Sequence, residues 1–157
     1  MEKEYILAAT VYNHFGVLQR VSGLFSRRGY NIKSLIAAET QDPAISNMTI
    51  VAVADENTVL QIKNQLLKLV DVYSVQILNE QNSVSREHIL IMVQATKSDL
   101  SGLIEKFGAL SLMKNPGSTV LELNGDPQLI NEFIKEISQY KIIKLVRSGV
   151  NALHTAE

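Results

Sequence analysis

The sequence contains no cysteine, and this absence excludes disulfides, thiolate metal sites and cysteine nucleophiles together. Long apolar runs are missing as well, since a run such as Ile89–Val93 is far too short to span a bilayer. The first residues, Met1–Glu4, lack the basic, apolar and small-residue pattern of a signal peptide and lead directly into a strand-like segment. We therefore expect a soluble protein of the cytoplasm.

An excess of either charge is also lacking. The chain has 15 Lys and Arg against 16 Asp and Glu, a net charge of −1, which gives no electrostatic reason to expect nucleic acid or an anionic membrane as a partner. Its strand-like segments carry aliphatic side chains where an RNA-binding sheet needs stacking aromatics. Apolar residues make up 46% and charged residues 20% of 157 residues, which is the composition of one ordinary domain or two small ones.

Residues arranged for catalysis or metal binding are scarce. Three histidines have no second ligand at useful spacing, so we predict no metal site: they are His14, His88 and His154. Glu39 and Asp42 would pair as acid and base, but a solvated loop explains them better. One enzyme class with a small α+β fold, acyl-phosphate hydrolysis, would use Arg20 or Arg28 with Asn31, although arginine on a solvent-facing helix is far commoner. We predict no catalytic residues.

Strand and helix patterns alternate along residues 1–78 in the order βαββαβ. Period-two and strand-forming segments predict strands, and i, i+3, i+4 spacing predicts two helices, the second capped by Asp55. The expected elements are a strand over 5–11, a helix over 16–28, strands over 30–38 and 45–53, a helix from 56 and a strand over 72–78. This order is the ferredoxin-like arrangement.

The same order repeats more faintly after a polar stretch, 79–86, which we interpret as a linker. A cap at Ser98 or Asp99 and a second cap at Asp126, with Pro127 as the first helical residue, predict two helices. The expected strands cover 87–95, 109–113, 119–123 and 142–146, with a turn over 115–118, and we expect a frayed tail from Asn151. The chain is therefore predicted to be α+β, with two ferredoxin-like βαββαβ domains at 1–78 and 87–157.

The segment from Asn13 to Ile32 is the strongest candidate for a binding site. Gly16, without a Cβ, lets a ligand approach the unpaired N–H groups of the helix that follows, which form a natural seat for a carboxylate. Asn13 offers an amide oxygen to an ammonium group. The alternative is that Asn13 starts a turn or caps the helix and that Gly16 only permits the bend. The first interpretation predicts a site for a small zwitterion, most simply a branched-chain amino acid.

Several motifs in this region closely resemble the small, regulatory subunit of acetolactate (acetohydroxyacid) synthase. The resemblance is dense over residues 5–78 and sparse beyond. The matching motifs are Asn13-x-x-Gly16-Val17-Leu18, the run Val21–Ile32, Thr40-x-Asp42-Pro43-x-Ile45-Ser46-x-Met48-Thr49-Ile50, Gln65-Leu66-x-Lys68-Leu69-Val70-Asp71-Val72, Arg86-Glu87 and Arg147-Ser148-Gly149-Val150.

The resemblance implies an N-terminal ACT domain that forms a homodimer and binds valine, or another branched-chain amino acid, between two chains. Carried over by motif, the ligand-binding residues are Asn13, Gly16, Val17 and Leu18 of one chain and Asn31 and Ile32 of the other. The family's separate large catalytic subunit carries thiamine diphosphate, FAD and magnesium. The small subunit has no cofactor; it raises the activity of that partner and confers feedback inhibition.

The chain also departs from this family pattern. His14-Phe15 fills a loop that usually has an acidic residue followed by a small residue or proline, so Phe15 would narrow the pocket or form part of its wall. Asn47 replaces a frequent arginine, and the segment 151–154 lacks the usual basic ending. The alternative function is a free-standing ACT-type sensor that regulates another enzyme or a repressor.

Overall fold

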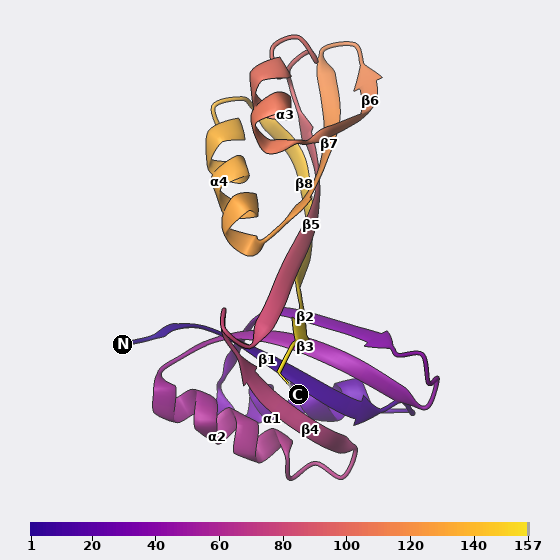
Figure 1. Ribbon diagram of the computed structural model, residues 1–157, viewed down its shortest axis with the longest axis vertical. Coiled ribbons are helices and arrows are strands. Elements are labelled where there is room, and N and C mark those ends of the chain that lie inside the picture. The colour runs from indigo at the N-terminus through magenta and orange to yellow at the C-terminus, as the bar shows by residue number, and fades with distance from the viewer. Residues whose placement is uncertain (157) are drawn as a thin grey trace. The chain divides into compact units, whose positions relative to one another are not determined.

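The computed structural model describes residues 1–156, with every side chain except that of residue 114. The chain forms two compact units (Figure 1). The first contains Met1–Val84 together with the segment that begins at Val150, and the second contains Ser85–Gly149. Among the described residues, no helix is long and apolar enough to cross a membrane.

The first unit has the predicted βαββαβ order. Its elements are β1 (Lys3–Tyr12), α1 (Val17–Arg28), β2 (Asn31–Glu39), β3 (Ile45–Ala54), α2 (Glu56–Leu66) and β4 (Val72–Leu78). The strands form an antiparallel sheet in the order β2-β3-β1-β4, and both helices cover the same face of it (Figure 1). Strands β1 and β3 are central, so β2 and β4 are the edges.

The core of this unit fixes the position of α1. Helical spacing in the sequence predicts one apolar face made of Val17, Leu18, Val21, Leu24 and Phe25, and the structure buries all of them except Leu18. They pack against alternate residues of β1 and β3, which point to the helix-covered face. The fifth, Leu18, is 49% exposed. The predicted C-terminal end is confirmed, since Gly29 closes α1 in the left-handed conformation with φ 68°, and the helix begins one residue later than predicted, at Val17.

The second unit repeats the order, and the α+β, twofold ferredoxin-like prediction is confirmed. Its elements are β5 (Ser83–Val93), α3 (Ser101–Phe107), β6 (Leu110–Asn115), β7 (Ser118–Gly125), α4 (Pro127–Ile137) and β8 (Ile142–His154), with strand order β6-β7-β5-β8. Asp126 caps α4 as predicted, because its carboxylate accepts a hydrogen bond from the Leu129 N–H at 2.9 Å.

Two sequence expectations were wrong at loops rich in hydrogen-bonding side chains. The polar stretch after β4 is a turn, in which Asn79 Oδ1 accepts from the N–H of Gln81 at 2.8 Å and Asn82 Oδ1 accepts from the Asn79 N–H at 2.7 Å. Strand β5 therefore begins at Ser83, inside the expected linker. Asp99 does not cap α3, because its carboxylate accepts from the Thr96 N–H at 2.8 Å, and the helix begins after Leu100 without a side-chain cap.

The expected frayed tail was also wrong. Strand β8 continues to His154, well beyond the predicted end at residue 146. The Ala152 N–H donates to Thr49 Oγ1 of β3 at 3.3 Å, and the Thr155 N–H donates to the carbonyl of Asn82 at 2.8 Å. These contacts order the tail within the first unit, and sequence periodicity could not reveal them because their partners are distant in the chain.

A candidate amino-acid pocket

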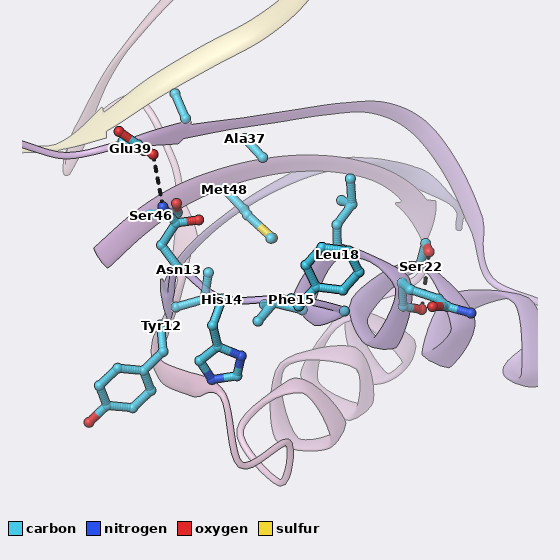
Figure 2. Close-up of a pocket in the computed structure, with 15 residues that line it drawn as sticks. Tyr12, Asn13, His14, Phe15, Leu18, Ser22, Ala37, Glu39, Ser46 and Met48 are labelled. Carbon is cyan, nitrogen blue, oxygen red and sulfur yellow. Dashed lines mark hydrogen bonds between the residues drawn. The ribbon is translucent and has the colours of Figure 1, made fainter. Parts of the chain in front are cut away.

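A pocket of about 660 Å³ opens at the N-terminal end of α1. It is bounded by the end of β1, the loop into α1, the end of β2 and the start of β3 (Figure 2). Four of the predicted ligand-binding residues line it: Asn13, Gly16, Val17 and Leu18. The described residues contain no cluster of three or more side chains able to hold a metal ion.

Gly16 sets the direction in which the chain enters α1. It adopts φ 85° and ψ −3°, the left-handed conformation, which costs a residue with a side chain about 1–2 kcal/mol. A Cβ at this position would meet only the end of the Arg20 side chain, at 3.6 Å. The glycine is therefore needed for its backbone conformation, and the room that it would leave for a ligand stays a prediction.

The first turn of α1 presents unpaired donors to the pocket. Among residues 1–156, the backbone N–H groups of Leu18 and Gln19 have no hydrogen-bond acceptor, and that of Val17 reaches His14 O only at 3.4 Å. No side chain caps this helix end, and its first turn contains no acidic residue. Unpaired N–H groups at the positive end of the helix dipole suit a carboxylate.

The Asn13 side chain is held in one orientation at the opposite end of the loop. Its Nδ2 donates to Glu39 Oε1 at 3.0 Å and to the carbonyl of Pro43 at 2.9 Å, the first of which is drawn in Figure 2. Because both partners are acceptors, the amide nitrogen must face them, and Oδ1 is the atom left to accept a bond from a ligand. Asn13 does not cap α1, whose N-cap is Gly16.

Behind the loop, a buried aspartate holds it in place. The Asp71 side chain is 5% exposed, and its Oδ1 lies 2.9 Å from His14 Nε2. Its Oδ2 lies 2.9 Å from Arg20 Nε, and these two atoms form an ion pair that lacks the alignment of a hydrogen bond. Arg20 Nη2 also donates to the carbonyl of Phe15 at 3.3 Å. Arg20 is thus committed to the loop, which removes it from the arginine–asparagine pair that acyl-phosphate hydrolysis would require.

The walls of the pocket are mainly apolar. Ala37 of β2 and Met48 of β3 lie across it from Leu18 of α1 (Figure 2), and Val17 also lines it. Phe15 lines the rim with a fully exposed side chain, so it adds an apolar surface without filling the space. This combination of polar ends and apolar walls suits a small zwitterion with a hydrocarbon side chain.

The two remaining predicted residues lie elsewhere in the unit. Asn31 and Ile32 begin β2, just after the C-terminal end of α1, and neither lines the pocket. Helix α1 has 12 residues and is therefore about 18 Å long. One chain alone does not bring Asn31 and Ile32 to the loop from Asn13 to Gly16.

Comparisons with known proteins agree over both units. A family model described as the AHAS small subunit-like ACT domain matches residues 7–74, and one described as the small subunit of acetolactate synthase matches residues 86–156. The acetolactate synthase isozyme 3 small subunit of Escherichia coli is 40% identical over 152 residues, covering 94% of this chain and 93% of that protein. The acetolactate synthase small subunit of Haemophilus influenzae is 37% identical over 156 residues, covering 97% and 96%.

A solved structure matches the whole fold. The crystal structure of the acetolactate synthase small subunit from Thermotoga maritima has a TM-score of 0.87 and 30% identity, with 99% of each chain covered. The sequence motifs, the two βαββαβ units and these full-length similarities lead to one assignment: the chain belongs to the family of acetolactate synthase small subunits.

Proposed function

We propose that the pocket at the start of α1 binds valine or another branched-chain amino acid, and that binding inhibits the enzyme this chain regulates. As a member of the small-subunit family, the chain is the non-catalytic, regulatory partner of an acetolactate synthase catalytic subunit. The choice of ligand is supported by one observation: the pocket has unpaired N–H donors of α1 and, apart from them, the acceptor Asn13 Oδ1, whose orientation is fixed. These two polar ends match the carboxylate and ammonium groups of an amino acid.

We further propose that the complete site is shared between two chains of a homodimer. Asn31 and Ile32 of a second copy would complete the open side of the pocket, since their own helix separates them from it. A ligand that contacts both chains binds more tightly to one arrangement of the dimer than to another. Its binding therefore shifts the equilibrium toward the arrangement that it prefers. An inhibitory effector needs this link between binding and assembly.

Under this proposal, the catalytic subunit carries out the reaction. Thiamine diphosphate, FAD and magnesium belong to the catalytic subunit, and this chain acts on that subunit in the cytoplasm by contact. The alternative of a free-standing ACT-type sensor is disfavoured by the match to the small-subunit family over residues 86–156 as well as the ACT domain. Stimulation of an acetolactate synthase catalytic subunit by this chain would distinguish the two.

Binding of valine, leucine and isoleucine, measured by calorimetry, tests the site. Asn13→Ala and Asn31→Ala should each weaken binding by about 1–3 kcal/mol, the cost of an unmade hydrogen bond to a charged group, with the fold intact. Asn64→Ala, at an exposed position of α2, is the matched control and should change nothing. Normal affinity in both the Asn13→Ala and Asn31→Ala variants would refute the site.

Mixed dimers test whether the site is shared. If it combines Asn13 of one chain with Asn31 of the other, a dimer of one Asn13→Ala chain and one Asn31→Ala chain retains one unaltered site. Half of the sites should then bind with normal affinity. If each site lies within a single chain, every site in the mixed dimer carries one substitution, and no site of normal affinity remains.

A further inference from the structure

We propose that Glu39 determines the chemical class of the effector: its carboxylate and Asn13 Oδ1 together receive an ammonium group, so that the pocket accepts α-amino acids and rejects the corresponding 2-oxo acids. This inference rests on the proposed function, because it assigns part of the same pocket. The sequence alone favoured a solvated loop as the explanation for Glu39.

Glu39 is the last residue of β2, and the pairing of β2 with β3 brings it to the pocket. Its Oε1 lies 3.0 Å from Asn13 Nδ2, which is near enough to make one polar surface of the two side chains (Figure 2). Among the described residues that line the pocket, Glu39 is the only acidic residue, and none is a lysine or an arginine. The nearby cation, Arg20, is paired with Asp71. The polar end of the pocket is therefore negative.

The polarity of this end is fixed by its hydrogen bonds. Rotating the Asn13 amide by half a turn would place Oδ1 against Glu39 Oε1 and the Pro43 carbonyl, with the loss of both bonds. Asn13 Oδ1 and the Glu39 carboxylate thus offer only acceptors to a ligand. An ammonium group supplies three donors and a positive charge, which is the complement of this arrangement.

A 2-oxo acid with the same hydrocarbon side chain differs only at this end. Its carboxylate would meet the N–H groups of α1, and its side chain would meet the same apolar walls, so those contacts cannot distinguish it from the amino acid. Its ketone oxygen, however, is an acceptor that would face two further acceptors, one of them negative. A site that accepts hydrogen bonds from a ligand's N–H groups disfavours an analogue that lacks those donors, because its own acceptors are then left unpaired. Glu39 would make the protein respond to the product of an amination and not to its keto precursor.

The experiment compares Glu39→Gln with the wild-type full-length chain. Affinities for L-valine and for 3-methyl-2-oxobutanoate are measured by calorimetry, and helical content is checked by circular dichroism. Wild type should prefer valine by about 100-fold or more. Glutamine keeps an oxygen for Asn13 but loses the charge, so Glu39→Gln should weaken valine binding by about tenfold and reduce the preference for valine by a similar factor. Glu80→Gln, which changes the net charge equally at an exposed turn outside the pocket, should leave both affinities unchanged.

The outcomes separate the two proposals. If wild type binds valine and Glu39→Gln retains the full preference over the 2-oxo acid, the role of Glu39 is overturned while the amino-acid site stands. A fall in valine affinity with an equal fall for the 2-oxo acid also overturns it, because the charge would then not discriminate. If the wild-type chain binds no branched-chain amino acid, the proposed function itself fails.

Discussion

Replacing two glycines of one segment by alanine should have opposite effects on stability. Gly16 precedes α1 in the left-handed conformation, whereas Gly23 lies within the helix. Gly16→Ala should destabilise the first unit by about 1–2 kcal/mol, because the added Cβ makes φ 85° unfavourable. Gly23→Ala should stabilise it by about 0.5–1 kcal/mol, because alanine loses less backbone freedom on forming a helix.

Steric clash does not decide the effect of either substitution. A Cβ at Gly16 would lie 3.6 Å from Arg20 Nη2 and a Cβ at Gly23 would lie 3.4 Å from Arg27 Nη1, both flexible ends of long side chains. The difference of about 1.5–3 kcal/mol between the two variants is therefore a measure of backbone conformation alone. Urea unfolding followed by circular dichroism gives the free energies, with the wild-type chain as reference.

Ligand binding should separate the same two variants. If Gly16→Ala relaxes to negative φ, the first N–H groups of α1 turn away from the pocket, and affinity for a branched-chain amino acid should fall. Gly23→Ala should bind as wild type does. A Gly16→Ala protein as stable as wild type, with unchanged affinity, would show that the left-handed entry into α1 does not organise this site.

Three further changes test contacts outside the pocket. The Thr58 backbone N–H holds the pKa of Asp55 below its ordinary value of 3.8, so the stability that Asp55 contributes is present above that value and is lost as pH falls through the lower folded-state pKa. The stability difference between wild type and Asp55→Ala should therefore shrink in acid, and a constant difference would contradict the assignment. Arg147→Met should destabilise the second unit by about 3 kcal/mol, measured by urea unfolding. The substitution leaves the Glu87 carboxylate, which is 2% exposed, without its bidentate ion pair at 2.6 and 2.7 Å. A loss below about 1 kcal/mol would refute this prediction. Asp126→Ala should cost about 1 kcal/mol through loss of the α4 cap, measured in the same way, and no loss would show that the cap adds nothing.

Local patterns predicted most of the fold. Helical spacing and caps identified α1, α2 and α4, because a buried face and a side-chain cap depend on residues only a few positions apart. The same reasoning predicted α3 but gave it the wrong cap, since Asp99 bonds back to Thr96 before the helix. It also failed at Asn79 and Asn82, whose polarity fits a linker and a tight turn equally well.

The sequence likewise predicted one side of the pocket and not the other. The loop from Asn13 to Gly16 was visible because turn residues directly precede an amphipathic helix. The opposite wall was not, because Glu39 and Met48 reach the pocket through the pairing of β2 with β3. Asp71 was noted only as part of a motif shared with the family, although its side chain pairs with His14 and Arg20 at this loop. Contacts of this kind depend on strand register, which short-range pattern does not reveal.

The return of the chain to the first unit at Val150 has a consequence for how the protein can be divided. Residues 85–149 are an insertion within the first unit, joined to it by two covalent crossings. Two cuts, one in each crossing, are needed to separate residues 85–149 from every residue of the first unit, and after a single cut the pieces are joined only by noncovalent contacts such as those of residues 150–156. An isolated fragment 1–84 would lack the strand whose Ala152 N–H meets Thr49, which is now only 4% exposed, and would present that part of β3 to water. Residues 85–149 are thus the segment to exchange while residues 150–156 are kept, and a truncation after β4 would remove part of the first unit as well as the second unit.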